Sequence, residues 1–160
     1  MSAFSAPRTA SDRSPRRRTT TALLGLVLLA TAAGACLPAD AQTFLERTNA
    51  LRSSQGVPAL ADHDALTQHA EEWARHLAET GVLAHSQLSK AGDGLAWTAL
   101  AENVGVSSPT EDTLRTIQDQ LAASSEHRAN MVNGQFTHMG VGVAEGADGR
   151  VWVVEVFAAL

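Results

Sequence analysis

The chain contains little sulfur and few aromatic rings. Of its 160 residues one is cysteine, none is tyrosine, three are tryptophan and four are phenylalanine. The single cysteine, Cys36, excludes an intramolecular disulfide, so hydrophobic packing must stabilise the domain. Because Cys36 lies near the N-terminus and no G-x-S-x-G sequence occurs, we expect no activated cysteine or serine nucleophile. The aromatic-poor helices also show no apolar groove of the kind that a lipid-binding protein would expose.

The chain also lacks a hydrophobic run long enough for a confident transmembrane helix. Its apolar stretch, residues 22–33, is shorter than the about 20 residues that span a bilayer. Five arginines precede this stretch, four of them within residues 13–18, and small residues follow it, which is typical of a targeting segment. We therefore expect residues 1–41 to be a signal peptide or lipoprotein leader. The protein is accordingly predicted to be secreted or otherwise extracytoplasmic.

Two cleavage signals compete in this leader. Ala39-Asp40-Ala41 forms an A-x-A site that would release a chain beginning at Gln42. Residues 33–36 read AGAC and resemble a bacterial lipobox, although Ala33 stands where a large aliphatic residue is usual. Lipidation of Cys36 would be the only membrane attachment that the sequence suggests. Both alternatives stay open.

Basic residues are scarce beyond the leader. Residues 42–160 contain seven basic and fifteen acidic residues, a formal charge of −8. Nucleic acids and anionic lipid surfaces usually require a basic face. We therefore expect no nucleic-acid partner. A neutral or cationic ligand is easier for this domain to accommodate.

Residues 42–160 are enough to close one hydrophobic core, and they contain no internal repeat. We expect a single domain and a monomer. Hydrophobic spacing predicts a helix over residues 43–55 and a second one from Asp62 or Asp64 to Gly81, with Leu66, Ala70, Trp73 and Leu77 on its buried stripe. Residues 82–107 are predicted to be irregular.

The sequence of the C-terminal part predicts a third helix followed by a β-hairpin. Ser108-Pro109-Thr110-Glu111 is typical of a capping box that opens a helix. Alternation over residues 139–144 and 151–157, with an Asp148-Gly149 turn between them, predicts two paired strands. Since the second strand is apolar on both faces, helices should cover both sides of the sheet. The fold class is therefore predicted to be α+β.

Four short segments follow one another in a characteristic order. They are His85-Ser86, Ala101-Glu102-Asn103-Val104-Gly105, Glu126-His127-Arg128-Ala129-Asn130 and Gly140-Val141-Gly142-Val143. Their order and wording resemble the CAP superfamily, the cysteine-rich secretory protein, antigen 5 and pathogenesis-related 1 group, in its short bacterial, SCP-like extracellular form. The resemblance covers about residues 42–160, as expected for one domain. It implies a three-layer αβα sandwich with a small antiparallel sheet between helices.

The resemblance also assigns a site. His85 and His127 take the places of the two cleft histidines of the family, and Glu102 takes that of its first glutamate. The second family glutamate has no match here, since the aligned positions are residues 121–124. Glu126 is a candidate replacement, although a solvated loop position is the simpler interpretation. The alternative for the whole set is a structural polar network of histidines bonded to backbone.

Two imidazoles could hold zinc or another divalent metal, with Glu102 as general base toward a bound water. Catalytic zinc usually has three protein ligands, so His85 and His127 alone are too few for a typical hydrolase. The leading hypothesis is an exported protein whose His/Glu-lined cleft binds a small ligand or a divalent metal, without established catalysis. The alternatives are a metal-assisted hydrolase of an extracellular peptide or cell-wall substrate, and a structural or interaction module. Its partner would be a small molecule, a lipid or an extracellular protein.

Other polar residues carry weaker predictions. His69, Glu72 and His76 share one face of the second helix and are expected to be solvated surface. His63 and His138 have no identifiable partners. Glu155 either faces the cleft or, as we prefer, reaches solvent from an edge strand. Arg128 and Asn130 are expected to fix the third motif by hydrogen bonds.

Overall fold

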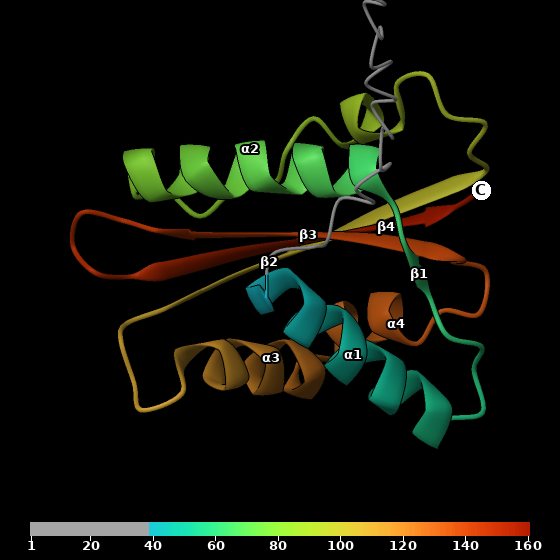
Figure 1. The fold of residues 1–160 in the computed structure, drawn as a ribbon, viewed down its shortest axis with the longest axis horizontal. Helices are drawn as coiled ribbons and strands as arrows, with labels where there is room; N and C mark the ends of the chain where they lie inside the picture. The colour runs from blue at the N-terminus through green and yellow to red at the C-terminus, as the bar shows by residue number, and fades with distance from the viewer. Residues whose placement is uncertain (1–38) are drawn as a thin grey trace, which may run out of the picture. The chain divides into compact units, whose positions relative to one another are not determined.

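A four-stranded sheet separates two layers of helices in the computed structural model, which describes residues 39–160 (Figure 1). The strands lie in the order β1-β3-β4-β2. Their bounds are Ala61–Asp62 for β1, Ala99–Ser107 for β2, His138–Glu145 for β3 and Val151–Ala159 for β4. Helix α2, Asp64–Thr80, covers one face. The other face is covered by α1, Ala39–Ser54, α3, Thr113–Ala123, and α4, Ser125–Met131. The predicted αβα sandwich is confirmed.

Three strands pair antiparallel and one pairs parallel, and of the antiparallel strands the sequence predicted β3 and β4. β3 and β4 form the predicted hairpin, with Gly149 in the turn at φ 78°, a conformation that favours glycine. β2 pairs antiparallel with β4, whereas the short β1 pairs parallel with β3. The sheet is therefore mixed. The predicted irregularity of residues 82–107 is wrong for residues 99–107, because pairing with β4 outweighs the weak strand pattern that Glu102, Asn103 and Gly105 produce.

Helix α2 agrees with its prediction in position, but Trp73 of the predicted buried stripe is only half-buried, and Ala74 is buried in its place. Leu66, Ala70, Ala74 and Leu77 are fully buried against the sheet. The helix ends at Gly81, whose backbone has φ 67° and whose N–H donates to the carbonyl of Leu77 at 2.8 Å. A short 3-10 helix, η1, Leu88–Gly92, lies between α2 and β2 in the chain.

The close approach of α2 to the sheet explains the glycines of the Gly140-Val141-Gly142-Val143 motif. A Cβ on Gly140 would lie 2.2 Å from the backbone of Leu66 and Thr67, and one on Gly142 would lie 2.2 Å from the backbone of Ala70. Backbone atoms cannot move away as a flexible side chain can. These two positions therefore require glycine for packing.

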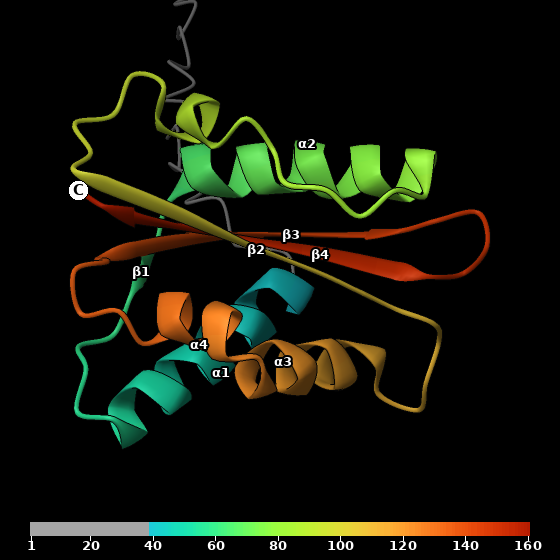
Figure 2. The same ribbon diagram turned by 180° about the vertical axis from the view of Figure 1, so that it is seen from behind.

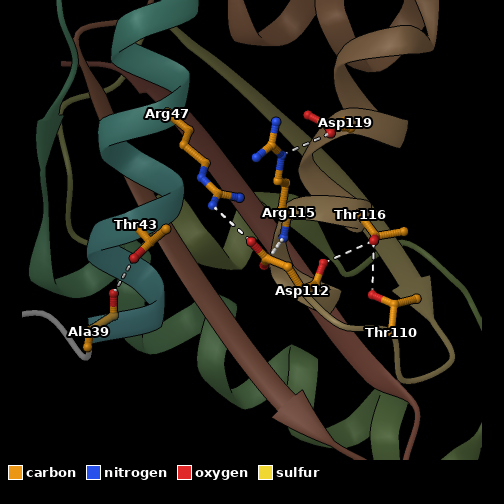
Figure 3. Close-up of polar contacts among 8 residues, drawn as sticks. All are labelled: Ala39, Thr43, Arg47, Thr110, Asp112, Arg115, Thr116 and Asp119. Carbon is orange, nitrogen blue, oxygen red and sulfur yellow. Dashed lines mark hydrogen bonds and ion pairs between the residues drawn. The ribbon is translucent and has the colours of Figure 1, made fainter.

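Helix α3 begins later than predicted, and its cap is a different residue. Asp112 is the N-cap, and its Oδ1 accepts from the N–H of Arg115 at 3.0 Å (Figure 3). The predicted capping box at residues 108–111 is wrong, because the helix begins only at Thr113 and Asp112 caps it; the hydroxyls of Thr110 and Thr116 lie 3.0 Å apart beside this cap. Arg47 of α1 reaches Asp112 at 3.6 Å, a partly exposed ion pair of small energetic value.

A buried arginine fastens α1 to the segment that follows α4. The Arg52 side chain is inaccessible to solvent, and its guanidinium donates to four carbonyl oxygens, those of Pro58 at 2.7 Å, Met131 and Asn133 at 2.9 Å and Phe136 at 3.0 Å. Burial lowers the pKa of Arg52, yet an arginine keeps its charge in proteins. The sequence pattern contained no sign of this contact. It holds α4, and with it the third motif, against the fold.

Candidate functional site

Glu102 lies at the centre of the candidate site. It belongs to β2, not to a loop as predicted, and its side chain is only 2% exposed. Its Oε1 lies 2.7 Å from Nδ1 of His85 and accepts from the N–H of Ser86 at 2.9 Å. Its Oε2 is buried and has no hydrogen-bond partner among residues 39–160. The structure therefore brings His85 and Glu102 into contact.

His85 is the accessible member of this pair. Its side chain is 63% exposed and stands on the segment that returns along α2 toward η1. With Nδ1 beside Glu102, Nε2 is the ring nitrogen left for another partner. A buried carboxylate that orients an exposed imidazole is an arrangement typical of binding and catalytic sites.

Ser86 connects this pair to α2. Its hydroxyl lies 2.9 Å from Nε2 of His69, which is half-buried. The prediction of a purely solvated face for His69 is wrong, because the segment after Gly81 folds back along the helix. A groove of about 440 Å³ lies there, and its lining consists of His69, Glu72, Trp73, His76, Ser86, Gln87 and Lys90. The lining does not include His85, Glu102 or His127.

His127 comes from the other layer of the sandwich. It lies on α4, where a loop was predicted, and its carbonyl accepts from Nδ2 of Asn103 at 3.1 Å. Its ring Nδ1 is buried without a hydrogen-bond partner in the described part of the chain. Glu126, beside it, is exposed in the first turn of α4. No hydrogen bond within residues 39–160 joins the His127 ring to His85 or Glu102.

The two halves of the predicted site thus flank β2 from opposite faces of the sheet. Successive strand residues point to opposite faces, so Glu102 turns toward the α2 layer and Asn103 toward α4. Figure 2 shows β2 in front, with the segment after α2 above it and α4 below it. Because β2 is the outer strand of the sheet, residues of both layers can reach its free edge. A shared role for His127 in the cleft stays a prediction.

On the α4 face of the sheet, Asn103 forms a buried polar network that includes the backbone of His127. Glu155 of β4 is fully buried, and its Oε2 accepts from Nδ2 of Asn103 at 2.9 Å. Asn130 of α4 donates to Oδ1 of Asn103 at 2.9 Å, which confirms its predicted bonding role. Burial raises the pKa of Glu155 to about 7, although the Asn103 hydrogen bond acts in the opposite direction.

The preferred prediction for Glu155 was wrong, because β4 lies inside the sheet between β3 and β2 and has no free edge. Asn103 was not identified as a network residue at all. A signal was available for Glu155 alone. A polar side chain within a strand that is apolar on both faces must find a buried partner.

A metal centre is not evident in this arrangement. The described residues contain no group of three or more histidine, cysteine or acidic side chains placed to hold a metal ion. Nδ1 of His85 is occupied by Glu102, which leaves this residue one ligating nitrogen. The residues present therefore do not fit a catalytic zinc with three protein ligands. Metal binding by His85 and His127 together stays a prediction.

An αβα sandwich in which His85, from the segment after α2, pairs with Glu102 of the outer strand β2 defines the class of this protein. The model of the CAP family, described as the cysteine-rich secretory protein family, matches residues 45–157. The chain therefore belongs to the CAP family. This confirms the family that the four ordered motifs predicted.

Bacterial proteins are among its relatives. The uncharacterized protein YkwD of Bacillus subtilis strain 168 is 25% identical over 130 residues, which are 76% of this chain and 48% of YkwD. An extracellular SCP-domain protein of Bacillus anthracis is 22% identical with a TM-score of 0.63, over 76% of this chain and 40% of that one. An outer surface protein of Borrelia burgdorferi is 17% identical with a TM-score of 0.66, over 74% of this chain and 91% of that one.

These likenesses establish the fold and leave the activity open. The chain spans about half the length of YkwD and less than half of the Bacillus anthracis protein. Within residues 39–160, every helix is too short or too polar to cross a membrane. The predicted leader, with Cys36, falls mostly on residues outside the described part. Only the last three residues of the predicted leader are described, and they open α1, with Ala41 buried in the core.

Proposed function

We propose that this is an exported CAP-domain protein that binds a small ligand beside His85 and Glu102. The observation that carries the proposal is Oε2 of Glu102, a buried carboxylate oxygen without a partner in residues 39–160. A buried acceptor left unpaired costs about 1–3 kcal/mol, and more if it is charged. A ligand N–H or O–H that gained access to this buried oxygen would remove this cost, while the exposed His85 ring would contact the rest of the ligand.

The charge of the domain favours a neutral or cationic ligand. Residues 42–160 carry a formal charge of −8, and the free oxygen belongs to an acidic side chain. An anionic ligand would be repelled by the net negative charge of the domain and by the carboxylate of Glu102. We therefore place an ammonium, guanidinium or hydroxyl group against Glu102.

Binding accounts for the site better than hydrolysis does. A metal-assisted hydrolase would use Glu102 as general base, yet one of its oxygens already holds Ser86 and His85. It would also need a third metal ligand, and the described residues do not supply one. Binding requires only the free oxygen and the exposed ring.

Export is supported by the relatives and by the N-terminal sequence. One structural relative is described as extracellular and another as an outer surface protein. The arginines and the apolar stretch of residues 1–38 are typical of a targeting segment. Removal of a signal peptide or lipidation of Cys36 would complete export.

Calorimetry tests the proposal with two probes, methylguanidinium and Zn²⁺. The purified protein should bind methylguanidinium, and Glu102→Gln should weaken binding at least tenfold, because the amide keeps the shape and loses the charge. Glu79→Gln, an exposed change on α2, is the matched control and should bind like the wild type. Equal binding by the Glu102 variant and the wild type would overturn the proposal. If the wild type binds Zn²⁺ and a His85→Ala/His127→Ala variant does not, the cleft would instead be assigned as a metal site.

A further inference from the structure

Two histidines without predicted partners lie against each other at the opposite edge of the sheet. β1 pairs parallel with β3, which sets Ala61 beside His138 and Asp62 beside Met139. The N–H of His63 then donates to the carbonyl of Met139 at 3.2 Å. Backbone pairing thus places His63, at the N-cap of α2, next to His138, and both residues are half-buried.

The separation of the two rings fits a shared metal ion. Their centroids lie 5.6 Å apart, and the ring planes are nearly perpendicular at 89°. A metal–nitrogen bond of about 2.0–2.1 Å places an imidazole centroid about 3.2 Å from the ion. Ligand angles of about 90–120° then separate two centroids by about 4.5–5.5 Å. Small side-chain rotations would bring the rings of His63 and His138 into this range.

Each of the two rings has a nitrogen atom available to bind a metal. Nδ1 of His138 lies 2.8 Å from the hydroxyl of Thr137, so Nε2 is the nitrogen left to ligate. This hydroxyl also fixes the ring, as outer-shell partners of metal-binding histidines do. Nδ1 of His63 is buried and has no hydrogen-bond partner within residues 39–160. A neutral imidazole always has one acceptor nitrogen, and a metal can satisfy it.

The surroundings tolerate a cation. His63 stands at the N-terminus of α2, where the helix dipole disfavours positive charge. Asp62 and Asp64 flank it and are exposed, so their negative charges offset this effect. The described residues place no third side chain for a metal, and water would complete the coordination.

We propose that His63 and His138 form a two-imidazole site for a late first-row divalent metal, with Cu²⁺ bound most tightly. Imidazole suits copper, nickel and zinc, and affinities at a given nitrogen site rise to a maximum at Cu²⁺. The site is separate from the pair of His85 and Glu102, and it does not depend on the function proposed for that pair.

Titration of the whole purified chain, freed of tags and of metal, with CuCl₂ tests this site. Calorimetry should show one equivalent bound, and electron paramagnetic resonance should show nitrogen ligands. His63→Gln and His138→Gln should each weaken binding at least tenfold, whereas His76→Gln, an exposed ring stacked on Trp73, should not. Zn²⁺ should bind at the same residues less tightly.

Several results would overturn the site. One is copper binding that both substitutions leave unchanged, and another is no binding at all. Binding lost only in His85→Gln would move the metal to the other edge of the sheet. Circular dichroism checks that each variant is folded. If one variant unfolds, its binding measurement is replaced by chemical modification of the wild-type protein with diethyl pyrocarbonate, which reacts with histidine rings. Cu²⁺ must then slow the modification of His63 and His138 for the proposal to stand.

Discussion

The buried carboxyl of Glu155 should make the stability of this protein fall as pH rises toward neutrality. Burial raises its pKa from 4.5 to about 7 in the folded state, whereas the unfolded chain exposes it to water. Between these two values the folded protein holds a proton that the unfolded chain has released. The free energy of unfolding therefore decreases with pH in this window. The stabilisation is fully present below about pH 4.5 and is lost as pH rises through about 7.

The magnitude follows from the size of the shift. Each pKa unit corresponds to about 1.4 kcal/mol, so a shift from 4.5 to about 7 is worth about 3 kcal/mol. Glu155→Gln removes the titration and keeps an oxygen that accepts from Asn103. The variant should gain stability relative to the wild type by about 3 kcal/mol between pH 4.5 and 7.5.

Urea denaturation at four pH values across this window measures the effect. The difference between variant and wild type isolates Glu155, because histidines and exposed acids titrate equally in both proteins. Glu145→Gln, an exposed change on β3, serves as the control and should give a difference that hardly varies with pH. A Glu155→Gln difference that stays constant from pH 4.5 to 7.5 would refute the reasoning.

Three further substitutions test the packing that positions the site, each by urea denaturation. Arg52→Met should cost about 3 kcal/mol or more, because four carbonyl oxygens lose a buried cationic donor; a cost below about 1 kcal/mol would contradict this. Gly140→Ala should cost about 3 kcal/mol through its clash with α2, whereas Gly134→Ala, which has open space, should cost little. Asp112→Ala should cost about 1 kcal/mol as a lost helix cap, and an unchanged midpoint would refute that role.

The sequence predicted the elements that follow a strong local pattern. Helix α2 and the β3–β4 hairpin show regular hydrophobic spacing and end at glycines or turn residues, so short-range rules locate them. Strand β2 was missed because its motif places Glu102, Asn103 and Gly105 close together. Only pairing with β4, which lies far along the chain, makes that segment a strand.

The site was predictable in part for the same reason. Motif order identified His85 and Glu102, and the structure joins them. The burial of Glu155, the bond from Ser86 to His69 and the nearness of His63 to His138 all arise from contacts distant in sequence. No periodicity along the chain encodes such contacts. They require the topology of the sheet to be known first.

The backbone amide of Ser86 gives the most direct test of the ligand site, because it donates to the same carboxylate that we expect to hold the ligand. Its resonance in ¹H–¹⁵N spectra should shift during titration of the wild type with methylguanidinium. The shift should be absent in Glu102→Gln and present in Glu79→Gln. An unmoved Ser86 amide in the wild type, or an equal shift in the Glu102 variant, would contradict the assignment of the site.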